Sequence, residues 1–584
     1  MWRSILSRFK TFYDVRAFRS SLTSLDALPQ FALLGILAGA VTGLVILVFR
    51  GLIELTLSLA IPEGPESFEM LSLIERALTP MAGAICIALY LFFFNAGNTR
   101  VGVVHVLERL HRHQGHMTHR GFLIQFIAGS LALISGQTGG REGPAIHLGA
   151  AASSLLGQRL QLPNNSIRVL VGCGAAAAIG SSFNTPIAGV IFAMEVILME
   201  YTIAGFMPVI LASVTGTLVV QFFLGSASMF SVPSVGLSQW QEIPFVIVAG
   251  VLLGCLAAAL VHGVRFVHRC APTHLAVRIT LAGATTAIIG LWVPEILGIG
   301  YDTVNFALAG QLGLFTLALI VLAKLLATMV AIAFGLPIGV IGPTLFVGAA
   351  AGSILWQLSQ FIGLSSTDPA FFALLGMGAM MGAMMGATLN APLAALMALM
   401  ELTQNSEIIL PAMLCIVIAT ITAAHGLKMP SLFNVQLQLQ GIELATTPVR
   451  QALSRVGVET LSNPNFDTVP RLIARADLVS MLERDLDWLI VESTDSSDRL
   501  ISASHAKDLL SADLSDIIDF SEPMEALVSA AQVPWQATLD EAFDIISQND
   551  VELLVVYRPS AAGVSTPLGI VLASDINSHS WQPS

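Results

Sequence analysis

The feature that most constrains the fold is an internal repeat of Gly- and Pro-interrupted segments. Gly140-x-x-Gly143-Pro144-x4-Gly149-Ala-Ala-Ala-x-Ser154-x-Leu156 recurs 199 residues later as Gly339-x-x-Gly342-Pro343-x4-Gly348-Ala-Ala-Ala-x-Ser353-x-Leu355. A second pair follows in the same order, since Asn184-Thr-Pro186 with Met194-Glu195 matches Asn390-Ala-Pro392 with Met400-Glu401. Two motif pairs that recur in the same order are hard to explain by chance similarity among Gly/Ala-rich helices. The sequence therefore predicts a chain built from two similar halves.

Composition places both halves in a membrane. Hydrophobic residues make up 55% of the chain, charged residues 11%, and the mean hydropathy is +0.77, whereas a soluble domain carries about 25% charge. Apolar segments recur from Leu33 to Ala424, and many are cut by Gly or Pro or are shorter than the ~20 residues that span a bilayer. Broken segments are tolerated where they enclose a path through protein. We expect a channel or transporter whose site lies where the halves meet.

The charge is divided unevenly along the chain. Residues 447–584 hold 8 of the 27 Lys/Arg and 21 of the 39 Asp/Glu, a net charge of −13 that leaves +1 for the rest. An acidic, soluble C-terminal part argues against a nucleic acid partner. Basic residues without a signal-peptide cleavage site precede the first apolar segment, which places the N-terminus in the cytoplasm. They are Arg3, Arg8, Lys10, Arg16 and Arg19.

The stretch Gly139–Gly149 holds the adjacent pair Arg141 and Glu142 among small apolar residues. A charge at membrane depth costs about 2.5–3.5 kcal/mol, which makes it a functional-site hypothesis. The glycines allow close approach of a ligand, and Pro144 suits the first turn of a helix whose N–H groups attract anions. A second such helix start at Gly339–Pro343 would complete a two-sided anion site, with Glu142 as an anion mimic. The alternative is a structural ion pair of Arg141 with Glu142.

Several histidines invite other interpretations. His147 follows Glu142 by five residues, and we expect a core histidine with satisfied hydrogen bonds. The cluster of His111, His113, His116 and His119 is spaced irregularly and includes no Cys or carboxylate. A basic cytoplasmic loop is therefore favoured over a metal site. The membrane part has neither an HExxH nor a GxSxG motif, and we do not expect an enzyme.

Beyond about Pro430 the pattern changes to short β-like runs and amphipathic helices. Trp488–Val491 and Glu552–Tyr557 predict strands, whereas Ser511–Ile518 and Asp540–Gln548 predict helices. Two similar βα-rich halves of about 60 residues each account for this stretch.

The motifs Gly140-Arg-Glu-Gly-Pro144 and Asn184-Thr-Pro-Ile-Ala-Gly189 resemble those of the CLC family of chloride channels and chloride/proton antiporters. The resemblance implies an all-α polytopic membrane protein of roughly 18 helices with an inverted repeat. It implies a cytoplasmic segment 1–28, a transmembrane domain 29–435 with halves 29–225 and 240–435, and a C-terminal α/β pair of CBS domains at 436–584. It also implies a homodimer in the lipid bilayer of a bacterial inner membrane, with the CBS domains in the cytoplasm.

The same resemblance assigns the site residues. Glu142 matches the gating glutamate, and the anion pathway would comprise Gly140, Arg141, Gly143, Val340, Ile341, Phe433, Val101 and Gly102. Val101 stands in place of an anion-contacting Ser, and Phe433 stands in place of the inner Tyr. Two hydroxyl groups are therefore missing, which predicts weaker anion binding. Fluoride transporters of the family also depart from the first of these segments, but the retained Gly-Pro pair and the tail favour chloride.

Val196 occupies the position of the internal proton-transfer glutamate of the antiporters. Because valine cannot carry a proton, a passive, glutamate-gated chloride channel is favoured. A chloride/proton antiporter in which Glu195 or Glu200 substitutes is the alternative. The recurrence of Glu195 as Glu401 favours a structural role for Glu195.

The resemblance also bears on cofactors. Asp575 fits the Asp that contacts ribose in CBS domains, but His505 replaces it in the first unit. Only one half of an ATP or AMP site therefore looks intact, and a structural tail is favoured over a nucleotide-binding one. No other cofactor and no metal is expected.

Overall fold

In the computed structural model, two compact units divide the chain. The first unit comprises 1–30, 160–167 and 445–584, and the second comprises 31–159 and 168–444. The structure describes residues 19, 22, 27–61, 64, 67–94, 100–199, 202–226, 230, 232, 235–237, 239–361, 368–389, 391–442, 448–492, 498–512, 516–520, 524, 526–559 and 565–580. Most of the basic N-terminal segment, Asn390 and Glu200 lie outside these residues.

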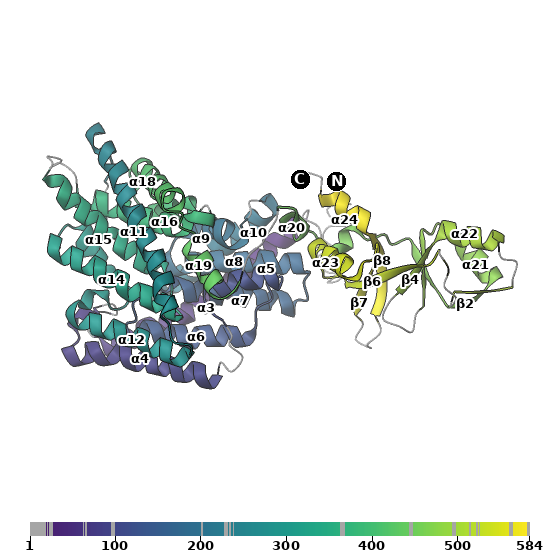
Figure 1. Cartoon of the computed structure of the whole chain (residues 1–584), viewed down its shortest axis with the longest axis horizontal. Coiled ribbons are helices and arrows are strands. Elements are labelled where there is room, and N and C mark those ends of the chain that lie inside the picture. The colour runs from purple at the N-terminus through teal and green to yellow at the C-terminus, as the bar shows by residue number, and fades with distance from the viewer. Residues whose placement is uncertain are drawn as a thin grey trace. The chain divides into compact units, whose positions relative to one another are not determined.

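The region up to residue 444 is helical (Figure 1). Its α-helices are α3 Leu28–Ala60, α4 Leu73–Phe94, α5 Val103–Arg112, α6 His119–Ile134, α7 Glu142–Arg159, α8 Asn164–Phe183, α9 Pro186–Phe192, α10 Ile203–Leu224, α11 Ile243–Arg269, α12 Leu275–Trp292, α13 Tyr301–Leu308, α14 Leu314–Phe334, α15 Ile341–Gln360, α16 Pro369–Leu389, α17 Pro392–Thr403, α18 Ile409–Ile421 and α19 Leu432–Leu439. Shorter turns are η1 Phe68–Met70, η3 Trp240–Glu242 and η4 Pro294–Ile296, and π-helical turns are η2 Ala193–Leu198 and η5 Thr422–Gly426.

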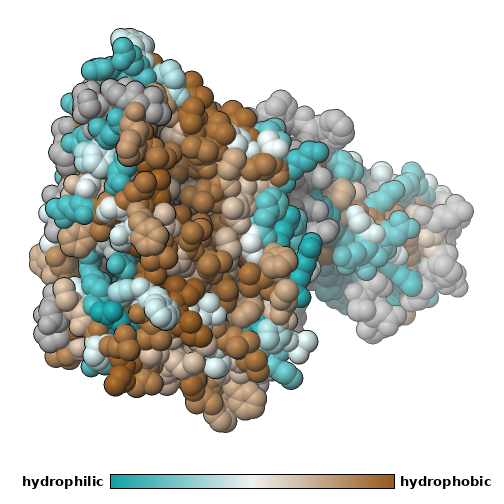
Figure 2. Space-filling model, turned by 60° about the vertical axis from the view of Figure 1, so that its left-hand side comes forward, coloured by the Kyte–Doolittle hydropathy of each residue, from teal (hydrophilic) through white to brown (hydrophobic). Residues whose placement is uncertain are grey.

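The helical unit is an integral membrane domain. Among the described residues, nine helices are long and apolar enough to cross a membrane, from α3 to the segment Ile409–Gly426. Apolar side chains cover a broad band of its surface in Figure 2. Bulky side chains such as Phe92, Phe222 and Phe315 are more than half exposed. Lipid is the environment in which so much exposed apolar surface is stable.

The two halves of the helical unit use their small residues in the same way. A Cβ on Gly149 of α7 would overlap the carbonyl oxygen of Gly174 on α8, and a Cβ on Gly348 of α15 would overlap that of Gly376 on α16. Each helix pair therefore crosses with its backbones in contact, which only glycine allows. This contact explains why the repeat keeps glycine at these positions.

The C-terminal unit is an α/β structure. Its strands are β1 Phe466–Val469, β2 Leu472–Ala474, β3 Trp488–Val491, β4 Asp498–Ser502, β5 Ile517–Asp519, β6 Val528–Pro534, β7 Leu553–Pro559 and β8 Ser565–Leu572. Its helices are α20 Pro448–Leu453, α21 Arg475–Leu482, α22 Ala503–Ala512, α23 Leu539–Asn549 and α24 Ala573–Ser580, with the short turn η6 Val458–Leu461. Six strands form one sheet in the order β1-β3-β4-β6-β7-β8, and β2 pairs with β5.

The sheet itself has a repeated pattern. The pairs β1–β3 and β6–β7 are parallel, each is followed by an antiparallel neighbour (β4 or β8), and β4 joins β6 antiparallel. Three apolar clusters lie in the described part of this unit: one around Trp535 and Leu554, one around Leu489 and Phe520, and one around Leu500 and Val555. The expectation of two similar βα halves is consistent with this topology.

The tail elements confirm three sequence predictions and correct one. Strands β3 and β7 and helix α23 lie where they were expected. The helix predicted at Ser511–Ile518 is wrong, because α22 ends at Ala512 and Ile517–Asp519 form strand β5. Ile518 pairs with Ile473 of β2 and is buried, so a strand contact prevails over the local helical pattern.

Candidate functional site

The two copies of the repeated motif meet directly. The N–H of Gly140 donates to the carbonyl oxygen of Gly339 at 3.0 Å, and the N–H of Gly339 donates to that of Gly140 at 2.7 Å. This antiparallel bridge lies immediately before the starts of α7 and α15. The first turns of the two helices are therefore held against each other, as the repeat predicts.

The carboxylate of Glu142 occupies the N-terminus of the opposite helix. Its Oε1 accepts a hydrogen bond of 3.0 Å from the backbone N–H of Gly342, in the first turn of α15. The N–H groups of Ile341 and of Glu142 itself also interact with the carboxylate. Glu142 is 1% exposed, and its Oε2 has no hydrogen-bond partner within the described part of the chain. The helix start thus already holds one negative group.

Glycine is required around this carboxylate. A Cβ on Gly140 would overlap Glu142 Oε2, and a Cβ on Gly339 would overlap Oε1. A Cβ on Gly143 would lie 2.8 Å from the Cα of Gly339. The three glycines therefore leave a space in which a small anion or a carboxylate fits, but a side chain does not.

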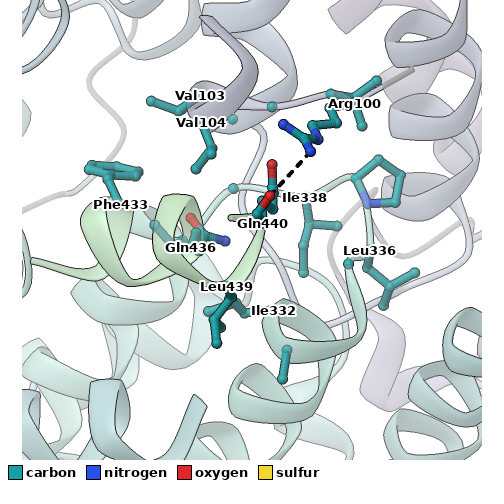
Figure 3. A pocket seen from close by; sticks show the side chains of 18 of the residues that line it. Arg100, Val103, Val104, Ile332, Leu336, Ile338, Phe433, Gln436, Leu439 and Gln440 are labelled. Atoms are coloured by element: carbon teal, nitrogen blue, oxygen red, sulfur yellow. Dashed lines mark hydrogen bonds between the residues drawn. The ribbon is translucent and has the colours of Figure 1, made fainter. Parts of the chain in front are cut away.

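A large pocket, which we call the vestibule, opens on one side of Glu142. It has a volume of about 340 Å³ and brings together seven of the residues that the sequence singles out. These are Val101, Gly102, Glu142, Gly143, Val340, Ile341 and Phe433. Figure 3 shows Phe433, Val103, Val104 and Gln436 around the space, with Arg100 bonded to the carbonyl oxygen of Gln440 at 3.2 Å.

The side chains around the vestibule suit an anion. Arg100, Arg278 and His268 line it, whereas Glu142 is its one acidic residue among the described ones. Val101 and Phe433 contribute no hydroxyl group, so polar contacts near Glu142 come from backbone N–H groups. An anion would meet a positive approach and an amide-lined end.

A second, narrow cavity of about 30 Å³ is also lined by Glu142 and Ile341. Apart from Thr185, its other walls are apolar, among them Phe183, Phe192 and Leu345. The carboxylate therefore lies between a wide polar space and a tight apolar one. Movement of this single side chain would change whether the two spaces connect.

Arg141 lies outside the vestibule. Its Nη1 lies 3.6 Å from Glu54 Oε1, and its guanidinium lies over the rings of Phe183 and Tyr301 at 5.3 and 5.8 Å. The alternative expectation, an ion pair between Arg141 and Glu142, is therefore wrong. The carboxylate that pairs with Arg141 is that of Glu54. Arg141, Arg50 and Glu54 line a separate cavity of about 100 Å³.

The second repeated pair forms reciprocal helix caps. Glu195 Oε2 accepts from the N–H of Ala394 at 2.8 Å, at the start of α17. Glu401 of α17 accepts from the N–H groups of Ile187 and Ala188 at 2.9 and 2.7 Å, at the start of α9. Val196 is buried in the π-helical turn η2. Each half thus caps a helix of the other, as expected of a shared structural role.

The sequence did not single out Lys324, and His147 differs from what the sequence predicts. Lys324 of α14 donates to the carbonyl oxygens of Ile296 and Gly298, both at 2.9 Å. His147 is fully buried, but neither ring nitrogen has a hydrogen-bond partner in the described part of the chain, so the expectation of a satisfied core histidine is wrong. The repeat offset was a usable signal, since it aligns Lys324 with Gln125 and His147 with Phe346.

The last of the predicted residues belongs to the C-terminal unit. Asp575 lies in the first turn of α24 in the C-terminal unit. In the sheet of that unit, burial and the Asp498 carboxylate raise the pKa of Tyr557. Among the described residues, no group of three or more His, Cys, Asp or Glu side chains could hold a metal ion. This includes the histidines of 111–119.

The chain matches known proteins over most of its helical region. A family model described as voltage gated chloride channel matches residues 81–424. A ClcB-like chloride channel protein of Ralstonia nicotianae is 31% identical over 367 residues, which cover 61% of this chain and 84% of that protein. A voltage-gated ClC-type chloride channel, ClcB, of Escherichia coli is 31% identical over 290 residues, covering 48% of this chain and 68% of that one.

Solved structures share the fold. A slow cyanobacterial Cl⁻/H⁺ antiporter matches with a TM-score of 0.61 and 22% identity over 71% of this chain and 98% of that one. A CLC-type fluoride/proton antiporter matches with a TM-score of 0.59 and 21% identity over 70% and 98%. A eukaryotic CLC transporter covers 94% of this chain and 99% of its own, with a TM-score of 0.58 and 17% identity.

Proposed function

The chain belongs to the family of voltage gated chloride channels, and we propose that it conducts chloride passively through a pathway that Glu142 opens and closes. The observation that carries this proposal is the bond from the Gly342 N–H to the Glu142 carboxylate at the start of α15. An anion bound to the same amides competes with that carboxylate. Protonation of Glu142 weakens its bond to the amides and favours the anion.

The passive mode rests on Val196. It is buried and cannot hold a proton, and Glu195 is held by the N–H of Ala394. A proton path through apolar protein needs titratable or water-linked stations. We therefore infer that anion flow does not require obligatory proton exchange.

Chloride/proton antiport is the second candidate. It is favoured by the similar fold of a protein described as a Cl⁻/H⁺ antiporter. A fluoride-type variant is favoured by the fold of a fluoride/proton antiporter and by the missing hydroxyl at Val101. Chloride is preferred because the Gly-Pro pair and the tail, which favour chloride in the sequence, are both retained.

We further propose that the helical domain spans 29–435 in a bacterial inner membrane as a homodimer, with both termini in the cytoplasm. The sheet of the 436–584 tail, with its repeated parallel and antiparallel pairs, supports a pair of CBS domains. Asp575 at the start of α24 would be its ribose contact if ATP or AMP binds there. Gln436, Leu439 and Gln440 line the vestibule and lie in or next to α19, the last helix before the tail, so the vestibule would open toward the cytoplasm.

Flux from purified full-length protein in liposomes tests the proposal. We expect chloride efflux that dissipates an anion gradient without uphill proton movement, followed with a pH dye. Substituting fluoride for chloride should lower the flux. Proton uptake against its gradient, driven by chloride, would establish antiport, and faster flux of fluoride than of chloride would overturn the choice of anion.

A further inference from the structure

Three charged side chains gather outside the vestibule, and we call them the charged triad. They are Arg50 and Glu54 of α3 and Arg141, the residue before α7. One carboxylate oxygen, Glu54 Oε1, accepts from Arg50 Nη2 at 3.0 Å and lies 3.6 Å from Arg141 Nη1. Because two guanidinium groups share a single carboxylate, the triad carries a net positive charge.

Arg141 has fewer hydrogen-bond acceptors than its burial requires. Its side chain is 10% exposed, and its Nε bonds to no group in the described part of the chain. The 3.6 Å separation from Glu54 is longer than an N–H···O hydrogen bond. The guanidinium also meets the faces of the Phe183 and Tyr301 rings, which attract a cation but leave its N–H groups without a strong acceptor. Because a buried charge is costly unless it is paired and bonded, this guanidinium favours a further negative ligand.

The cavity of about 100 Å³ beside the triad offers room for that ligand. Arg50, Glu54 and Arg141 line it together with Gly298, Ile299 and apolar side chains. A water molecule takes up about 30 Å³ in the liquid, so the cavity admits a small anion with a few waters at most and excludes a large organic one. Glu54 is the one acidic group among the described residues of its wall.

The triad adjoins the narrow cavity that Glu142 lines. Phe183 forms part of that cavity, and the Arg141 guanidinium lies over the ring of Phe183 at 5.3 Å. Phe183 and Arg50 also line a third pocket, of about 170 Å³. Contacts through one aromatic ring therefore lead from the carboxylate of Glu142 to the triad.

We propose that Arg50 and Arg141 bind a small monovalent anion and that Glu54 competes with this anion for Arg141. The pathway then has a second anion site besides the start of α15. The inference rests on the proposed function in one respect, that the anion is the chloride that the chain transports. A carboxylate covers a positive site in both places, since Glu142 covers backbone amides and Glu54 covers a guanidinium.

Within the triad, Glu54 is the side chain that can give way to an anion. It is 38% exposed, whereas Arg141 is nine-tenths buried. Arg50 is held independently of Glu54, because its Nη1 donates to the carbonyl oxygen of Ser181 at 3.2 Å. A structural ion pair at i,i+4 explains the contact of Arg50 with Glu54, but it leaves Arg141 without an acceptor at hydrogen-bond distance.

Calorimetric titration of chloride into purified full-length protein at neutral pH tests the proposal, with gluconate keeping the ionic strength constant. Glu54→Gln removes the competing charge at nearly equal size. Arg141→Gln removes the cation for which Glu54 and the anion compete. Asp368→Asn and Arg269→Gln are the matched controls, because each removes one exposed charge of the same sign from a residue that does not line the cavity.

We expect Glu54→Gln to bind chloride about threefold more tightly than the wild type, the size of effect typical of a partly exposed ion pair. Arg141→Gln should bind chloride about tenfold more weakly, because a charge-assisted contact is lost. In the double variant Glu54→Gln/Arg141→Gln the threefold gain should vanish, because the shared cation is gone. Both controls should bind chloride as the wild type does.

Unchanged affinity in Glu54→Gln, or a gain that survives in the double variant, overturns the proposal and makes Arg50 and Glu54 a structural ion pair. If Arg141→Gln does not fold, Arg50→Gln takes its place in the same comparison. If neither folds, the affinity of Glu54→Gln relative to Asp368→Asn decides.

Glu142→Ala separates this site from the gate. If Glu142→Ala binds chloride more tightly while Glu54→Gln binds it like the wild type, the triad site is wrong and the gate stands. If Glu54→Gln binds chloride more tightly while Glu142→Ala binds it like the wild type, the gate is wrong and the triad site stands.

Discussion

The two halves of the membrane domain share a backbone and differ in the side chains placed on it. In each half, a glycine with positive φ comes just after the end of a helix, Gly136 after α6 and Gly335 after α14. A few residues later, Gly140 of the first half bridges to Gly339 of the second. The next helix begins at Glu142 in one half and at Ile341 in the other. One half therefore offers free amides, and the other offers the carboxylate that covers them.

The two halves also differ in the side chains at two other buried positions. Gln125 of α6 donates to the Pro337 carbonyl at 3.3 Å, whereas Lys324, its counterpart in α14, donates to a group of loop carbonyls. At another buried position, His147 of the first half corresponds to Phe346 of the second. The first half therefore carries the carboxylate and the buried imidazole, whereas the second half carries the helix start that the carboxylate covers and a lysine bonded to loop carbonyls. Variants in each half test this difference between the two halves.

The largest effect is expected from filling the shared space. Gly339→Ala puts a Cβ onto the Glu142 carboxylate and next to the Gly143 backbone. Because backbone cannot yield as a side chain can, we expect loss of transport by at least about tenfold, or failure to fold. Flux in liposomes and size-exclusion chromatography measure this.

Gly51→Ala in α3 is the matched control, because a Cβ there meets no atom within 4 Å. It should transport like the wild type. Normal flux from Gly339→Ala would show that the contact between the two motifs is not needed.

The next largest effect is expected on stability, when the hydrogen-bond donor of Lys324 or of Gln125 is removed. Lys324→Met leaves the carbonyl oxygens of Ile296 and Gly298 without their donor, and we expect a loss of about 3 kcal/mol in unfolding free energy. Gln125→Met removes one longer bond and should cost about 1 kcal/mol. Thermal unfolding in detergent compares the two. Equal destabilisation would contradict the view that the lysine contacts of the second half stabilise the fold more than the glutamine contact of the first.

The smallest effect concerns the caps, where the halves are symmetric. Glu195→Ala and Glu401→Ala each remove an acceptor from the start of a helix, and each should destabilise by about 1 kcal/mol. Neither should alter the pH dependence of chloride flux. A pH profile that changes in Glu195→Ala would instead make Glu195 the internal proton site.

The sequence predicted the membrane class, the two halves and the meeting of their glycine motifs, because close backbone contacts leave glycine in fixed positions. Through the family resemblance, the sequence also assigned one pathway to a set of residues that line the same pocket in the structure. They are Val101, Val340, Ile341 and Phe433. It did not predict Arg141 turning to Glu54, since residues 54 and 141 share no local pattern. Contacts between distant segments likewise decided the strand at Ile517–Asp519 and the unsatisfied His147.

The central claim is that the Glu142 carboxylate and the transported anion compete for the start of α15. Titration of chloride into purified protein, followed by calorimetry, tests it most directly. A charge-assisted hydrogen bond contributes about 1.5–3 kcal/mol, so Glu142→Ala should bind chloride about tenfold or more tightly than the wild type at neutral pH. Equal affinities in the two proteins would contradict the account.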